Sequence, residues 1–209
     1  MRSPSDVRKI LYRLLKMHPE AECALRHESA LELLVATILS AQCTDERVNL
    51  VTRDLFDRFH TAEEYAAATR DEIEELIRST GFFRNKAKSL HGMAKLLVED
   101  YGGEVPDKLP DLIRLPGVAR KTANVVLGTW FGKAVGVVVD THVGRISRRL
   151  GMTVEEDPVK VERDLMSQLP KTQWIGFSHR LIHLGRGYCK SRKTNCGPCA
   201  MKDVCPSAT

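Results

Sequence analysis

The chain has 209 residues, of which 43% are hydrophobic, and a formal net charge of +5 at pH 7. This length can form one large or two small domains with adequate cores. The N-terminus lacks the apolar core of a signal peptide, and uncharged runs such as 33–44 are too short to cross a membrane. We therefore expect a soluble, cytoplasmic protein without a membrane partner.

Helical spacing of apolar residues dominates the first half of the chain. The first expected helix has an apolar face of Val7, Ile10, Leu11, Leu14 and Leu15 behind a cap at Ser5/Asp6. Further helices are expected at 31–39, which is apolar nearly all round, at 48–59, after a Thr61–Glu64 capping box, at 71–80 before Gly81, and at 87–97 before Gly102-Gly103.

A turn lies between two further helical patterns in the middle of the chain. A single-turn helix at 110–115 leads into Pro116-Gly117, and Lys121 lies in the first turn of the next helix. Free backbone N–H groups at such a turn and helix N-terminus form a cradle for phosphate. The helix dipole disfavours a charged lysine there, and a neutral amine is a nucleophile. The alternative is an ordinary turn with a solvated lysine.

The remainder of the chain is also expected to be helical. Residues 134–139 form a β-branched run with no second strand to pair with, so we expect a buried extended connection. Helices are expected at 142–150, 158–168 and 172–188. The fold class predicted for the whole chain is all-α.

Four cysteines cluster near the C-terminus, and their spacing is C-x6-C-x2-C-x5-C; they are Cys189, Cys196, Cys199 and Cys205. Disulfides are disfavoured in a cytoplasmic protein. Structural zinc sites usually have two separated C-x-x-C pairs, whereas one pair with two outlying cysteines suits the corners of a [4Fe–4S] cluster better. Zinc remains the alternative. Cys23 and Cys43 are expected to be small core residues.

The charge of the chain is also concentrated near these cysteines. Residues 180–205 carry six basic residues and one acid. Three of the cations, Lys190, Arg192 and Lys193, lie between the first two cysteines, where a loop held by the cluster could present them to phosphates. The alternative is a solvated basic tail.

Together these features resemble one family of DNA repair enzymes. They are the Pro116-Gly117 turn, Lys121, an aspartate (Asp140) 19 residues beyond it, the cysteine spacing, and the segments "LLVATILSAQCTD" (33–45) and "VDTHVGRISRRLG" (139–151). The resemblance runs essentially from end to end and is to endonuclease III, a base-excision DNA glycosylase of the helix-hairpin-helix superfamily.

The resemblance implies two α-helical domains with a DNA-binding cleft between them. Residues 22–132 would form a six-helix barrel containing the hairpin, and 1–21 with 133–209 a discontinuous domain containing a [4Fe–4S] cluster. The implied partner is double-stranded DNA with damaged bases or abasic sites, bound by a monomer associated with the nucleoid. Three residues depart from the family pattern: Ala119 replaces a usual glycine, Phe82 a common leucine, and Cys43 a common alanine.

The implied reaction begins with rotation of the damaged nucleotide out of the duplex. Gln42 would fill the hole, Phe82 would wedge into the stack, and Gly117 and Ala119 would lie against the DNA backbone. Alternatively, Gln42 merely caps a loop start and Phe82 is a core residue after Gly81.

The resemblance assigns the chemistry to Lys121 and Asp140. Lys121 would attack C1′, expel an oxidised pyrimidine and form a Schiff base, and β-elimination would break the strand on the 3′ side. Asp140 would stabilise positive charge on the sugar and accept a proton. It could also cap the following helix, and the two roles are compatible.

Three rival functions remain. Adenine-excising relatives generally lack the lysine and carry an extra C-terminal domain, and mismatch-specific thymine glycosylases usually have tyrosine at this position. A non-enzymatic helix-hairpin-helix module would share the Pro116-Gly117 turn and the basic tail, but it would not need Lys121 and Asp140 together.

Overall fold

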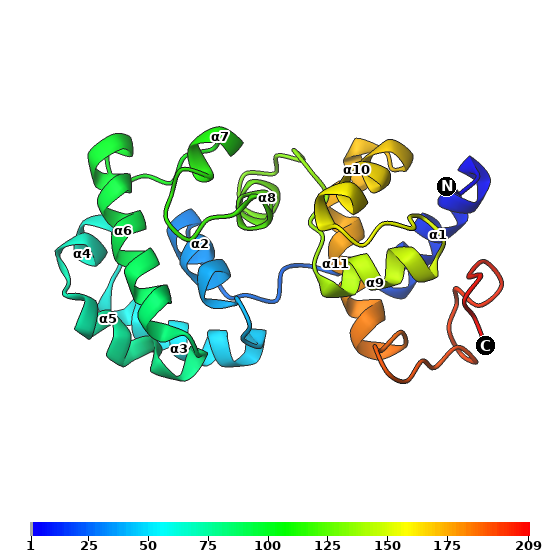
Figure 1. The fold of residues 1–209 in the computed structure, drawn as a ribbon, viewed down its shortest axis with the longest axis horizontal. Helices are drawn as coiled ribbons and strands as arrows, with labels where there is room; N and C mark the ends of the chain where they lie inside the picture. Colours follow the sequence, from blue (N-terminus) through cyan, green and yellow to red (C-terminus); the bar gives the residue numbers. More distant parts are fainter. Residues whose placement is uncertain (1) are drawn as a thin grey trace. The chain divides into compact units, whose positions relative to one another are not determined.

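The computed structural model describes residues 2–209, which form two compact units (Figure 1). The hairpin unit is Ala24–Lys133, and the cysteine unit combines the chain up to Cys23 with Ala134–Thr209. These boundaries lie within two residues of the expected ones. The described residues contain helices and one isolated bridge, between Cys189 and Thr194, but no β-strand. The predicted all-α class is confirmed.

The hairpin unit is built from seven α-helices and one 3-10 helix. They are α2 (Ala30–Leu39), α3 (Asp45–Arg58), α4 (Ala62–Ala67), α5 (Arg70–Ile77), η1 (Arg78–Thr80), α6 (Phe83–Tyr101), α7 (Leu109–Leu112) and α8 (Arg120–Thr129). The long α6 packs against α4 and α5, and α2 packs against α3 and α8. Helix α2 is buried from residue 33 to residue 39, which confirms the expectation from its continuous apolar sequence.

Caps fix the helix boundaries in this unit. The predicted capping box of Thr61 and Glu64 is present at the start of α4. A second box, Thr69 with Glu72, starts α5 at Arg70, one residue before the expected start. Helix α6 ends where expected, because Gly102 adopts a left-handed conformation with φ of 60°.

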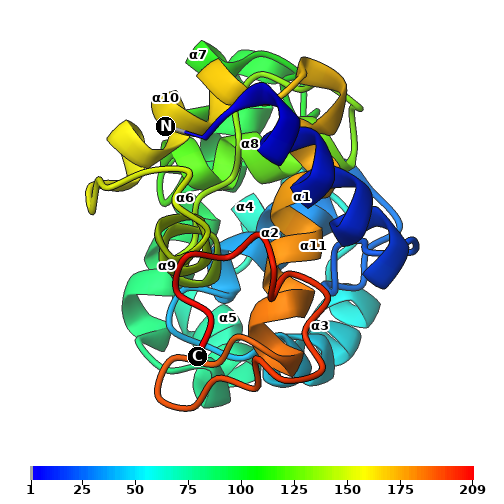
Figure 2. The ribbon, with the colours of Figure 1, turned by 90° about the vertical axis from the view of Figure 1, so that its right-hand side faces the viewer.

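The cysteine unit contains α1 (Pro4–Met17), α9 (Thr141–Arg149), α10 (Pro158–Gln168), η2 (Lys171–Gln173) and α11 (Trp174–Gly187). Helix α11 packs against α1 and α9, and the chain beyond it folds back past α9 toward α1 (Figure 2). Val137, in the expected extended connection, is buried in this core. None of the described helices is both long and apolar enough to span a membrane.

Two details of α1 differ from the sequence expectation. The cap is Ser3, whose hydroxyl accepts the backbone N–H of Asp6 at 3.1 Å, and Pro4 occupies the first helical position. Leu15 was assigned to the core face but is 44% exposed, whereas Val7, Ile10 and Leu14 are buried. The apolar face is therefore narrower than its sequence pattern.

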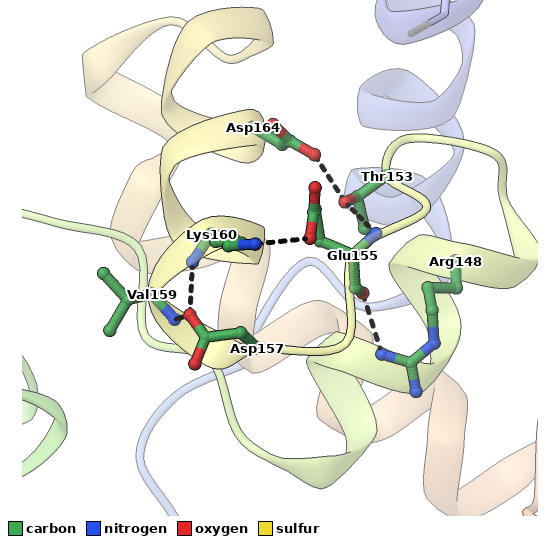
Figure 3. Close-up of polar contacts among 7 residues, drawn as sticks. All are labelled: Arg148, Thr153, Glu155, Asp157, Val159, Lys160 and Asp164. Carbon is green, nitrogen blue, oxygen red and sulfur yellow. Dashed lines mark hydrogen bonds and ion pairs between the residues drawn. The ribbon is translucent and has the colours of Figure 1, made fainter.

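The loop between α9 and α10 is held by side-chain hydrogen bonds (Figure 3). Asp157 caps α10 by accepting the backbone N–H groups of Val159 at 3.1 Å and Lys160 at 3.0 Å. Thr153 donates to Asp164 at 2.5 Å, and Arg148 donates to the carbonyl of Glu155 at 3.2 Å. These contacts connect the end of α9 to α10.

Partly buried histidines make the stability of the cysteine unit depend on pH. Burial lowers the pKa of His18 and His179, and the charge of His183 lowers both further. The unfolded chain has a histidine pKa of about 6.5 and therefore begins to bind protons at a higher pH than the folded chain does. The stabilisation is complete above about pH 6.5 and is lost as the pH falls from there through the lower pKa values of the folded chain.

We expect His179→Gln to flatten this dependence between pH 7.5 and 5.5 by an amount of order 1 kcal/mol, because glutamine does not titrate in this range. Urea unfolding at several pH values, followed by a probe in the cysteine unit, measures the effect. The exposed His60, in the other unit, provides a control as His60→Gln. An unchanged slope in His179→Gln would show that His179 does not cause the pH dependence.

Candidate active site

The hairpin turn joins α7 to α8 in the hairpin unit. Val118 donates its N–H to the carbonyl of Leu115 at 3.0 Å, with Pro116 and Gly117 at the two central positions. Gly117 has φ of 80°, which a type II turn requires at its third residue. A Cβ atom at Gly117 would lie 2.7 Å from the Cβ of Ser89 on α6, so glycine is also needed for packing. Helix α7 is shorter than the expected 110–115.

The N-cap residue of α8 provides no side-chain hydrogen bond to the first turn. This residue is Ala119, which is exposed. Its φ of −85° is ordinary for an L-residue, so replacement of the usual glycine causes no backbone strain here. Uncapped N–H groups at a helix N-terminus can bind an anion, and a DNA phosphate has that charge.

Lys121 projects from this same first turn and is exposed. Close to the turn, Pro116 borders an open hollow that is also lined by Arg70, Lys88 and Lys95. The surroundings of the hairpin are thus positively charged, which favours an anionic ligand.

Gln42 and Phe82 are the two non-glycine residues between positions 2 and 209 with positive φ, 54° and 47°. Such a conformation is uncommon for glutamine and costly for a bulky residue. Phe82 is 64% exposed, so the alternative that it belongs to the core is wrong. Gln42 is exposed as well, and Thr44, not Gln42, caps α3. Strained, exposed side chains of this kind cluster at functional sites.

Asp140 lies in the cysteine unit at the start of α9. One carboxylate oxygen accepts the backbone N–H of Val143 at 2.7 Å, which confirms the capping role. Burial lowers the pKa of His179 and the pKa of Arg145. The negative charge of Asp140 opposes part of each decrease. The carboxylate is therefore close enough to two cationic or titratable groups to interact with them electrostatically.

The four C-terminal cysteines line a single pocket, with Met201 and Tyr188 among its other residues. All four thiols are free of disulfides. Among residues 2–209, no three His, Cys, Asp or Glu side chains converge as the ligands of one metal ion must. A [4Fe–4S] cluster does not require such convergence, because each cysteine binds a different iron. A shared pocket lined by four free thiols fits that group.

Two arginines of α9 that sequence reasoning missed hold the loop beyond α11. Arg149 donates to Cys189 Sγ at 3.2 Å and to the carbonyl of Lys190 at 2.8 Å, and Arg145 donates to the carbonyl of Cys189 at 3.0 Å. The side chains of Lys190, Arg192 and Lys193 are exposed on this loop. The loop is thus fixed at its backbone while its cations face solvent.

Comparison with known proteins places this arrangement in a family. Residues 35–171 match the model of the HhH-GPD superfamily base excision DNA repair proteins. Endonuclease III of Synechocystis sp. is 54% identical over 200 residues, which cover 96% of this chain and 91% of that protein. Two solved structures are also similar: a non-covalent endonuclease III–DNA complex and a trapped endonuclease III–DNA covalent intermediate. Each has a TM-score of 0.94 and 42% sequence identity to this chain. Both matches cover 100% of this chain, with 97% of the protein chain in the first structure and 98% in the second.

The chain therefore belongs to the endonuclease III family within the HhH-GPD superfamily. It is an enzyme of base-excision repair, a DNA glycosylase with AP lyase activity.

Proposed function

We propose that this enzyme removes oxidised pyrimidines from duplex DNA and then cleaves the strand 3′ to the abasic site through a lysine Schiff base. The observation that carries the proposal is the exposed side chain of Lys121 in the first turn of α8, close behind the Pro116-Gly117 turn. This geometry offers a phosphate cradle and a nucleophile side by side. A non-enzymatic DNA-binding module would need only the cradle.

The damaged nucleotide must leave the helical stack before the amine can reach its sugar. We propose that Gln42 occupies the vacated space while Phe82 stacks on the exposed base pairs. Their left-handed conformations and exposure support this role, because each side chain stands out from a loop between helices. Gly117 and Ala119 would approach the phosphates closely, since neither has a large side chain.

The chemistry then takes place at C1′ of the extruded nucleotide. The neutral amine of Lys121 attacks C1′, the bond to the base breaks, and the base leaves with a proton. Opening of the sugar ring gives an iminium, which makes the 2′ proton acidic. Loss of that proton breaks the bond from C3′ to its oxygen and so cuts the strand. Asp140 would stabilise the positive charge and accept the proton from the lysine ammonium.

Strand scission of an abasic duplex, followed by a panel of duplexes that each contain one lesion, tests this function. We expect cleavage 3′ to the abasic site and excision of oxidised or ring-saturated pyrimidines. Excision of normal adenine or of mismatched thymine in preference to these lesions would contradict the substrate class.

We further propose that Cys189, Cys196, Cys199 and Cys205 hold a [4Fe–4S] cluster with a structural role. The cluster supplies no step of the base excision; it fixes the loop that carries Lys190, Arg192 and Lys193, which would contact DNA phosphates. The protein is proposed to act as a monomer, because one chain contains every group that the reaction uses.

Cys199→Ser is expected to lower the iron and sulfide content and to weaken duplex binding by about tenfold or more, because the cationic loop loses its fixed geometry. Binding titrations at several salt concentrations should also show a smaller salt dependence, since fewer phosphates are contacted. Cys23→Ser, outside both the four-cysteine set and the loop that carries Gln42, is the matched control. Full cluster loss with unaltered DNA affinity and salt dependence would overturn the structural role.

A further inference from the structure

Lys86 is a buried lysine that connects two loops of the hairpin unit. It is 5% exposed and lies in the first turn of α6. Its ammonium donates to the carbonyl of Leu39 at 2.8 Å and to the carbonyl of Thr80 at 2.9 Å. Leu39 is the last residue of α2, and Thr80 is the last residue of η1. These two segments are 41 residues apart in the sequence, and one side chain joins them.

Each of the two carbonyls stands just before one of the strained residues. Gln42 follows Leu39 by three positions, and Phe82 follows Thr80 by two. Lys86 also donates its backbone N–H to the carbonyl of Phe82 at 3.1 Å. The loop with Gln42 is thus connected through Lys86 to the residue that begins α6.

Lysine is an unusual residue at a position as buried as this one. Removing an ammonium from water is costly, and burial lowers the pKa of Lys86. Its neighbours on the inner face of α6, such as Ala87, Leu90 and Met93, are apolar and fully buried. A methionine of similar length would fill the space without desolvating a charge. Lysine differs from it by donors that can satisfy carbonyls of two separate loops.

We propose that Lys86 is a positioning residue. It fixes the spacing between the Gln42 loop (residues 40–44) and the Phe82 loop (residues 81–82), so that the side chains of Gln42 and Phe82 enter the duplex together. The proposal rests on the roles proposed above for Gln42 and Phe82. Left-handed backbone at a non-glycine residue persists only where its surroundings hold it. A rigid connection between the two loops meets that requirement, and it prepares both residues before DNA binds.

The test compares two reactions that differ in their need for loop insertion. Excision of a paired lesion from a duplex requires the nucleotide to be rotated out and the hole to be filled. Borohydride trapping on a single-stranded abasic oligonucleotide requires neither, because no stack has to be opened. Fluorescence of 2-aminopurine opposite the lesion reports the unstacking directly. The variant is Lys86→Met, and Leu97→Ala, at a fully buried position further along α6, is the control for lost stability.

Lys86→Met is expected to lower single-turnover duplex excision by about tenfold or more, since small displacements of positioning groups have effects of this size. Trapping on the single strand should stay within about twofold of the unmodified protein, and the 2-aminopurine signal should fall. Leu97→Ala, assayed below its melting temperature, should keep the ratio of the two reactions unchanged. Lys86→Arg, which retains a cation and its donors, should recover part of the duplex rate.

Unchanged duplex excision by folded Lys86→Met, or an equal fall of both reactions, would overturn the proposal. If the methionine variant is too unstable to purify, Lys86→Gln, which keeps an amide donor for one carbonyl, is subjected to the same comparison and judged by the same results. Gln42→Ala and Phe82→Ala distinguish a failure of the insertion roles from a failure of the positioning role of Lys86. Normal duplex excision by both would refute their insertion roles, whereas reduced excision by both with normal Lys86→Met would refute the role of Lys86 alone.

Discussion

Lys121→Ala is expected to abolish the covalent complex that borohydride traps with abasic DNA. Strand cleavage should fall by about 10³-fold or more, the scale seen when a catalytic nucleophile is removed. Duplex affinity should change little, because the backbone N–H groups of the α8 first turn remain. Single-turnover cleavage, trapping and binding titrations on the same duplex measure the three quantities.

Two further variants make this result specific to the amine. Lys121→Arg keeps the positive charge but replaces the amine with a guanidinium that stays protonated, so it should be as inactive as the alanine variant. Lys108→Ala removes another exposed lysine of the hairpin unit and should retain the trap. An active Lys121→Arg enzyme would show that only the charge at this position matters.

Asp140→Asn is expected to lower turnover by about 10²-fold while leaving duplex binding unchanged. The carboxylate would no longer stabilise positive charge on the sugar or accept a proton, and such groups contribute about 10²- to 10⁴-fold. Asparagine is as good an N-cap as aspartate, so the hydrogen bond from the Val143 N–H should persist and α9 should keep its stability. The substitution therefore separates the charge from the cap.

The control for this prediction is a second aspartate with the same structural task. Asp157 caps α10 in the cysteine unit, so Asp157→Asn should preserve both stability and turnover. Asp140→Ala removes the cap as well, and it should cost about 1 kcal/mol of unfolding free energy in addition to activity. Full activity of Asp140→Asn would exclude the carboxylate from the chemistry.

The spacing of apolar residues predicted the helical fold because it is a local signal. Helix α10 has the expected bounds, and most others differ by one to three residues. The errors occurred where neighbouring polar residues compete for one role. Ser3 and Ser5 can both start α1, and only the direction of the entering chain decides between them. Leu15 follows the apolar pattern of α1 but is 44% exposed, so the rest of the chain covers it only in part.

The residues proposed for the site could be named from their motifs, whereas the residues that contact and hold their loops could not. The sequence left open whether Phe82 is a core residue, because burial depends on contacts that the motif does not contain. Lys86 is a single polar residue on the apolar face of α6. Nothing in the sequence around it identifies two carbonyls of other segments as its partners. Arg149 contacts a loop 40 residues further along the chain. Long-range hydrogen bonds of this kind leave no periodic signal.

The central claim is that the amine of Lys121 itself becomes bonded to the sugar. Digestion of the borohydride-trapped complex with a protease, followed by mass spectrometry of the DNA-linked peptide, tests it most directly. The account predicts that the reduced sugar remnant is found on Lys121. A remnant attached to any other residue, with Lys121 unmodified, would contradict it.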